Sequence, residues 1–137
     1  MNLLLPISAA TAMVLTLFYV KLAFGVIKKR QLHRVALGAG QHADLEAAIR
    51  AHGNFAEYVP LALLLLVVAE VNHSPWWLVG AAALSLVTGR IIHASAITDS
   101  DLKRRVLGMK LTFGSLALGI VANAAPFIMA LINTPKT

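Results

Sequence analysis

Long apolar runs separated by short polar segments dominate the chain. Four runs cover residues of about 3–27, 45–71, 76–97 and 106–132. Each exceeds the roughly 20 residues that an α-helix needs to cross a hydrocarbon layer about 30 Å thick. The runs are continuous, as the stretch 61–66 illustrates, whereas membrane strands alternate apolar and polar positions over about 10 residues. The pattern predicts an all-α integral membrane protein in which one domain, residues 1–137, forms a four-helix bundle.

The composition is typical of a membrane protein and excludes soluble, disordered and disulfide-rich proteins. Of 137 residues, 58% are hydrophobic and 13% are charged, and the mean hydropathy is +0.76. Soluble domains carry about 25% charged residues, and disordered chains are poor in apolar residues. The chain has no cysteine, which excludes a disulfide scaffold. Any thiol chemistry must therefore arrive with a substrate.

The basic residues predict an orientation. The net charge is +6, and lysine and arginine gather at positions 28–34 and 103–105, between apolar runs. The segment 70–75, between the second and third runs, has no lysine or arginine. Beyond the fourth run, Lys136 is the only basic residue. The positive-inside rule therefore places both basic loops in the cytoplasm and both termini on the non-cytoplasmic side. Nucleic acid is not an expected partner, because that would require a basic face on a soluble fold.

No basic residue precedes the first run, which is too long for a signal peptide, so we expect a retained membrane helix.

Polar residues also occur where lipid contact is expected, in the first half of the second run. Four side chains share one helical face through i, i+4, i+7 and i+8 spacing: Arg50, Asn54, Glu57 and Tyr58. Ionisable groups at membrane depth usually face a bundle interior or a water-filled cavity. The structural alternative is an Arg50–Glu57 pair that only joins helices. His52 lies around the helix from this face, and we expect it at the membrane interface.

The third run adds Arg90 and His93 at i, i+3. A metal site would need further ligands on the same face, so we expect no metal. Lysines near helix ends, such as Lys21, are expected to extend to the headgroups. Five arginines are expected around the polar face of the second helix: Arg30, Arg50, Arg90, Arg104 and Arg105. Such a pocket suits a small anionic ligand that also carries an amine for Glu57, and its lipid-facing side would admit an apolar co-substrate.

Three stretches of the chain resemble a known family. The stretch 50–60, Arg-Ala-His-Gly-Asn-Phe-Ala-Glu-Tyr-Val-Pro, resembles the signature of the MAPEG superfamily, the membrane-associated proteins of eicosanoid and glutathione metabolism. The stretch 89–93 resembles its third-helix motif, and 27–35 resembles the end of its first helix. The resemblance covers the whole chain and is nearest to short bacterial members.

The resemblance implies a homotrimer in the bacterial inner membrane, with glutathione as co-substrate between neighbouring subunits near the cytoplasmic face. An arginine at the start of the fourth helix activates the thiol in some members, and both Arg104 and Arg105 stand near that place. Ile97 stands where several catalytic members carry a tyrosine. The glutathione-binding role carries over to Arg30, Arg50, Asn54, Glu57, Tyr58, and Arg90 or His93.

The implied function is a glutathione transferase or peroxidase that acts on hydrophobic electrophiles. A free thiol has a pKa of about 8.5, so little thiolate exists at neutral pH, and a guanidinium within hydrogen-bond reach would lower that pKa. The alternative is a non-catalytic lipid-binding or scaffold protein of the same fold. A small multidrug exporter would need a membrane-embedded acid in the first helix, and residues 3–27 contain none.

Overall fold

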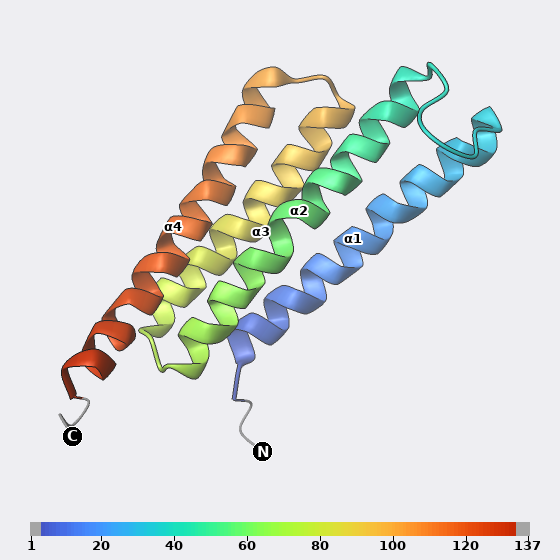
Figure 1. Cartoon of the computed structure of the whole chain (residues 1–137). Coiled ribbons are helices and arrows are strands. Elements are labelled where there is room, and N and C mark those ends of the chain that lie inside the picture. The colour runs from blue at the N-terminus through green and yellow to red at the C-terminus, as the bar shows by residue number, and fades with distance from the viewer. Residues whose placement is uncertain (1–3, 134–137) are drawn as a thin grey trace.

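The computed structural model describes residues 4–133 and contains four long helices that run alternately up and down. They are α1 (Pro6–His33), α2 (Ala43–Val71), α3 (Trp76–Thr98) and α4 (Leu102–Asn133). The start of α1 and the end of α4 lie at the same end of the bundle (Figure 1). All four helices are long and apolar enough to cross a membrane. The prediction of an all-α bundle of four apolar helices is confirmed.

Two helices extend further than the apolar runs do. α1 continues past residue 27 through the basic segment and ends at His33, where Arg34 adopts a left-handed φ of 54°. α4 begins at Leu102 rather than near 106, because the Asp101 carboxylate accepts a hydrogen bond of 3.0 Å from the Arg104 backbone N–H. Polar helical turns are stable here, since water can solvate their side chains outside the hydrocarbon layer. The expected helix start at residue 3 and Lys136 lie outside the described residues.

Two glycines allow α3 and α4 to approach closely. A Cβ added at Gly108 would lie 2.7 Å from the Cβ of His93, and one at Gly89 would lie 2.9 Å from the Gly108 carbonyl oxygen. Close approach lets side-chain hydroxyls bond to the facing backbone. Ser85 Oγ donates to the Leu111 carbonyl of α4 at 2.8 Å. This contact fixes the rotation of α3 against α4 at the level of the polar residues.

A glutamate fastens the other end of the bundle. Glu70, in the last turn of α2, accepts hydrogen bonds from the backbone N–H groups of Ile7 at 2.9 Å and Ser8 at 2.8 Å. These N–H groups belong to the first turn of α1, where no intrahelical acceptor is available. The carboxylate therefore caps α1 from a neighbouring helix, which accounts for an acidic residue at the apolar end.

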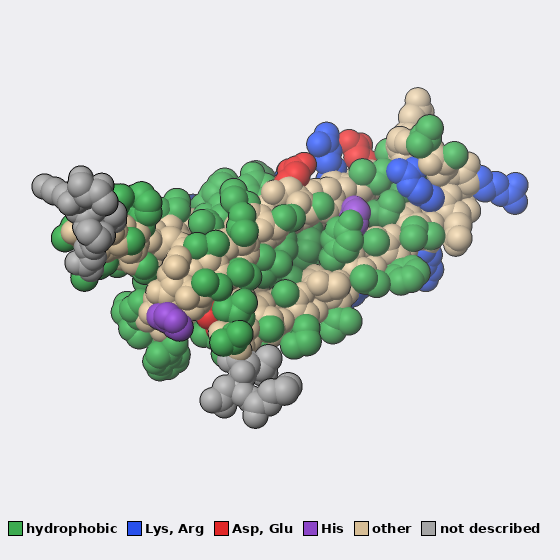
Figure 2. Space-filling model, turned by 60° about the horizontal axis from the view of Figure 1, so that its bottom comes forward, with side chains coloured by type: hydrophobic (Ala, Val, Ile, Leu, Met, Phe, Trp, Pro, Cys, Tyr) green, Lys and Arg blue, Asp and Glu red, His purple; other side chains and the backbone are tan. Residues whose placement is uncertain are grey.

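The surface divides into an apolar body and a basic end. Large apolar side chains such as Leu17, Leu64 and Phe127 are more than half exposed along the helices. Figure 2 shows this apolar surface along one face, with lysine and arginine side chains gathered toward one end. The basic segments after α1 and before α4 both lie at that end (Figure 1). This distribution is that of a helical bundle surrounded by lipid.

Candidate functional site

A cavity of about 300 Å³ opens between α2, α3 and α4 toward the basic end of the bundle. α2 supplies most of its wall, α3 contributes one apolar side chain from its last turn, and α4 contributes one arginine from its first. The lining residues are Ile49, Arg50, Gly53, Asn54, Glu57, Ile97 and Arg105. Three of the four polar residues predicted to share a face of α2 thus meet in one cavity, together with one of the two candidate arginines of α4.

Within residues 4–133, the charged side chains of this cavity form no ion pair. Arg50, Glu57 and Arg105 are all exposed. The ion pairs recorded among residues 4–133 involve Asp44 and Asp99, not Glu57. The pair that would merely join helices, Arg50 with Glu57, is not among them. Two cations and one carboxylate are therefore available to a ligand that carries both signs of charge.

Arg90 lies directly behind the cavity and is 1% exposed. Its Nε donates to Thr112 Oγ1 at 3.0 Å, and its Nη1 donates to Asn54 Oδ1 at 2.9 Å. Its guanidinium carbon also lies 5.4 Å from the ring centroid of Tyr58. Buried charges are retained when their donors are satisfied. Arg90 therefore connects α2, α3 and α4 and does not line the cavity itself.

The contact with Arg90 sets the orientation of the Asn54 side chain. Arginine can only donate hydrogen bonds, so the atom of Asn54 that faces it must be the carboxamide oxygen. The amide nitrogen of Asn54 is consequently left for the cavity, which Asn54 helps to line. Asn54 therefore presents a hydrogen-bond donor to the cavity. A ligand carboxylate could accept a hydrogen bond from it.

His93 fixes the first turn of α4. It is 3% exposed, and its Nδ1 lies 3.0 Å from the Arg105 carbonyl oxygen. A carbonyl can only accept, so Nδ1 carries the proton. His93 thus holds the backbone of the residue whose side chain lines the cavity.

Among the described residues no group of three or more potential ligands could hold a metal ion.

Besides Arg90 and His93, three further predicted site residues lie outside the cavity wall. Tyr58 lies against the Arg90 guanidinium and makes a T-shaped ring contact with Phe113. Arg30 donates to backbone carbonyls of the loop after α1, including that of Gly38 at 3.1 Å. Arg104 donates to Asp99 Oδ2 at 3.2 Å and Ser95 Oγ at 3.3 Å. In a single chain the structure therefore brings Arg105, and not Arg104, to the cavity.

Sequence reasoning did not identify Thr112, whose hydroxyl is the acceptor for Arg90 Nε. Thr112 is fully buried, and its own hydroxyl donates to the Gly108 carbonyl at 2.9 Å. The available signal was its i+4 spacing from Gly108, which places a hydroxyl one turn beyond the point of closest helix approach. The ring of His52 packs on Tyr19 of α1, with centroids 4.7 Å apart, and its expected position at the membrane interface stays a prediction.

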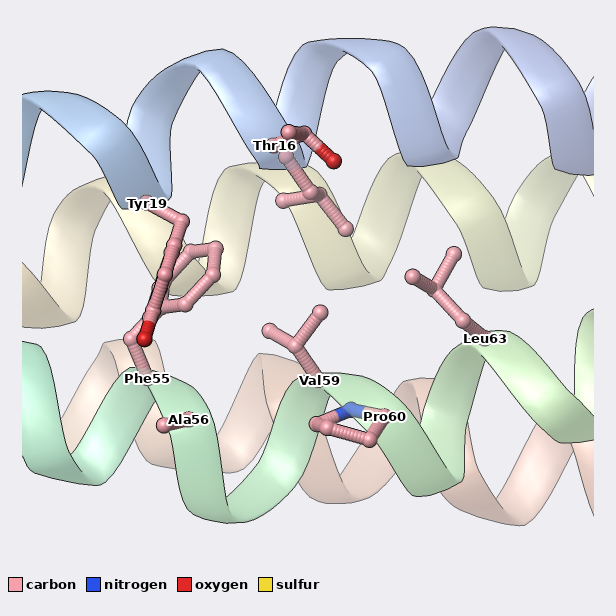
Figure 3. A pocket seen from close by; sticks show the side chains of 8 residues that line it. Thr16, Tyr19, Phe55, Ala56, Val59, Pro60 and Leu63 are labelled. Atoms are coloured by element: carbon pink, nitrogen blue, oxygen red, sulfur yellow. The ribbon is translucent and has the colours of Figure 1, made fainter.

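A second cavity, of about 250 Å³, lies between α1 and α2. In Figure 3 Tyr19 reaches from α1 across to Phe55 and Ala56 of α2, and Val59 and Leu63 follow further along α2. Pro60 has no N–H, so the Ala56 carbonyl lacks its usual intrahelical donor. This cavity is apolar, and exposed residues at its edge, including Thr16 and Pro60, open it to the bilayer.

Comparisons with known proteins agree with this architecture. Residues 8–125 match the sequence profile of the MAPEG family. The chain is 35% identical over 117 residues to the inner membrane protein YecN of Escherichia coli strain K12, covering 85% of this chain and 89% of that protein. YecN of Escherichia coli O6:H1 matches with the same identity and coverage. With the four apolar helices, the similarity to an inner membrane protein confirms the prediction of a multi-pass protein of that membrane.

Proposed function

Because this chain belongs to the MAPEG family, some of whose members are glutathione transferases, we propose that it binds glutathione in the cavity formed by α2, α3 and α4. The observation that carries the proposal is a set of charged groups without an ion-pair partner among residues 4–133: Arg50, Arg105 and Glu57, with the Asn54 amide oriented by Arg90. Glutathione has two carboxylates and one ammonium group. The cavity offers Arg50 and the Asn54 amide to the two carboxylates and Glu57 to the ammonium group, which leaves the Arg105 guanidinium for the thiol.

We assign thiol activation to Arg105. Its guanidinium lines the cavity, and arginine keeps its charge even when partly desolvated. A positive charge next to the sulfur stabilises the thiolate, and the thiol proton leaves to solvent. The sulfur then attacks an electrophilic carbon, so that a C–S bond forms while the leaving group departs with its bonding electrons. The protein contributes proximity and charge stabilisation, without a covalent intermediate.

The lipophilic second substrate enters from the bilayer. The apolar cavity between α1 and α2 is open at Thr16 and Pro60, and one of its lining residues, Ala56, directly precedes Glu57 of the charged cavity. Both cavities therefore adjoin the same exposed strip of α2. A homotrimer would place a neighbouring chain against this strip and close the site, with the basic end of each bundle in the cytoplasm and both termini on the other side.

A binding measurement tests the proposal. Glutathione is titrated into the full-length protein in detergent, alongside Arg50→Ala, Glu57→Ala and a control, Lys103→Ala. Lys103 is exposed and does not line the cavity. Loss of one charge-assisted contact costs about 1.5–3 kcal/mol, so each cavity variant should bind at least about tenfold more weakly, while the control should be unchanged. Equal affinity for all four proteins would contradict the proposal.

A turnover measurement distinguishes an enzyme from a non-catalytic member of the fold. The same proteins are assayed for conjugation of glutathione to an aryl halide, with Arg104→Ala and Arg105→Ala tested singly. The proposal predicts turnover that falls by at least about tenfold in Arg105→Ala and much less in Arg104→Ala. Glutathione binding without turnover would favour the lipid-binding or scaffold alternative. Equal rates for both arginine variants would contradict the assignment of Arg105.

A further inference from the structure

A third hollow, of about 290 Å³, lies between α1 and α3 and is separate from both cavities described above. Its floor is apolar, formed by Phe18 and Leu22 of α1 with Ile91 and Ala94 of α3. One edge is polar, formed by the remaining lining residues: Lys21, Ser95, Thr98 and Asp99. We call this hollow the α1–α3 groove. It combines an apolar floor with a charged edge, the two properties of a lipid with a polar headgroup.

Among the described residues, Lys21 is the charged side chain of the groove without an ion-pair partner. Its Nζ lies 5.9 Å from the ring centroid of Phe18, so the ammonium group lies over the groove floor rather than extending along the helix. Lys21 is not among the ion-paired or hydrogen-bonded side chains recorded for residues 4–133. Asp99, the other charged lining residue, is paired at 3.2 Å with Arg104 of α4, which does not line the groove itself. The groove therefore presents one net positive charge.

The charged edge lies at the depth of a lipid headgroup. α3 has 23 residues and is therefore about 35 Å long, close to the thickness of the hydrocarbon layer. Ser95 and Thr98 belong to its last turn, and Asp99 is its C-terminal cap. α1 continues beyond this level to His33. Lys21 thus lies where α3 leaves the apolar layer at the basic end of the bundle, although it is far from the end of its own helix.

We propose that the α1–α3 groove is a binding site for an anionic phospholipid, with the phosphate at Lys21 and an acyl chain along Phe18 and Ile91. Charge complementarity favours this occupant, because basic pockets between membrane helices at the cytoplasmic side bind anionic headgroups. The exposed part of Ile91, 44% of its surface, continues the groove floor toward the bilayer. This site is independent of glutathione binding.

Lipid selectivity of the full-length protein tests the proposal. The purified protein in detergent is titrated with phosphatidylglycerol and, separately, with phosphatidylcholine, and bound lipid is counted by native mass spectrometry. One lysine near the membrane surface favours an anionic lipid by about fivefold. The wild-type protein should therefore retain phosphatidylglycerol about fivefold better than phosphatidylcholine. Lys21→Ala should bind both lipids equally, and Lys21→Arg should keep the preference because it keeps the charge.

Lys110→Ala is the matched control. Lys110 is an exposed lysine of another apolar helix, α4, and it does not line the groove. This variant should keep the preference for phosphatidylglycerol. Three results would overturn the proposal: equal retention of both lipids by the wild-type protein, an undiminished preference in Lys21→Ala, or an equal loss in Lys110→Ala, which would indicate a diffuse effect of net charge.

Discussion

Arg90 donates a hydrogen bond of 2.9 Å to the side-chain oxygen of Asn54 and a second, of 3.3 Å, to its backbone carbonyl. Both groups of Asn54 are thus held by one guanidinium that is 1% exposed. Asn54 lines the cavity, whereas Arg90 does not. Arg90, a residue of α3, thus orients a side chain that lines the cavity. Whether Asn54 presents a donor or an acceptor to a ligand therefore depends on α3.

The substitution Asn54→Asp tests this polarity. One oxygen of the new carboxylate can still accept from Arg90, while the second oxygen replaces the amide donor with a negative charge. Glutathione should bind about tenfold more weakly or worse, since a hydrogen bond to a charged group, worth about 1.5–3 kcal/mol, is replaced by repulsion. Calorimetric titration measures the change. Asn72→Asp, an exposed position beyond the far end of α2, is the control, and unaltered affinity in Asn54→Asp would show that the amide does not contact the ligand.

Thr112→Val should destabilise the bundle. The substitution keeps the shape of a fully buried side chain but removes the acceptor of Arg90 Nε. An unsatisfied buried donor costs about 1–3 kcal/mol. The free energy of unfolding, measured by denaturant titration in detergent micelles, should fall by that amount. Thr16→Val, at an exposed threonine of α1, should leave it nearly unchanged; equal stability of both variants would mean that water satisfies Arg90.

Gly108→Ala tests the close approach of α3 and α4. The added Cβ would meet the backbone N of His93 at 2.7 Å, so the helices must separate. Overpacking of this kind costs about 1–3 kcal/mol, and it should also weaken glutathione binding because His93 and Arg90 move with α3. Gly80→Ala is the matched control, since nothing lies within 4 Å of a Cβ there. A Gly108→Ala protein as stable as Gly80→Ala would refute the packing argument.

Glu70→Leu should loosen the start of α1. The substitution leaves the N–H groups of Ile7 and Ser8 without their acceptor, and loss of a helix N-cap typically costs about 1 kcal/mol. Backbone hydrogen exchange should accelerate in the first turn of α1 and stay constant in α3. Glu46→Leu, which removes an exposed carboxylate near the start of α2, provides the comparison. Unchanged exchange in the first turn of α1 would mean that Glu70 does not cap it.

The sequence predicts the helices well because hydrocarbon thickness imposes a minimum length on each apolar run. It underestimates the length of α1 and α4 at the basic end, because helical turns such as residues 28–33 are polar and are not recognised as part of a membrane helix. It also misses the cap that Glu70 provides, because Glu70 and Ile7 are 63 residues apart in the chain.

For the candidate site, helical spacing predicts that Arg50, Asn54 and Glu57 share a face, and the cavity brings them together. Spacing does not separate Arg104 from Arg105, which are successive residues of the same turn. Only the position of α4, fixed by Gly108 and by the bond from His93 to the Arg105 carbonyl, turns Arg105 toward the cavity. Similarly, the role of Arg90 depends on three helices at once and is not encoded in one of them.

A structure of the protein solved with saturating glutathione tests the central claim most directly. The account predicts density for a tripeptide in the cavity of α2, α3 and α4, with its carboxylates near Arg50 and the Asn54 amide, its ammonium near Glu57 and its sulfur near Arg105. An empty cavity at saturating ligand, or a tripeptide bound elsewhere on the bundle, would contradict it.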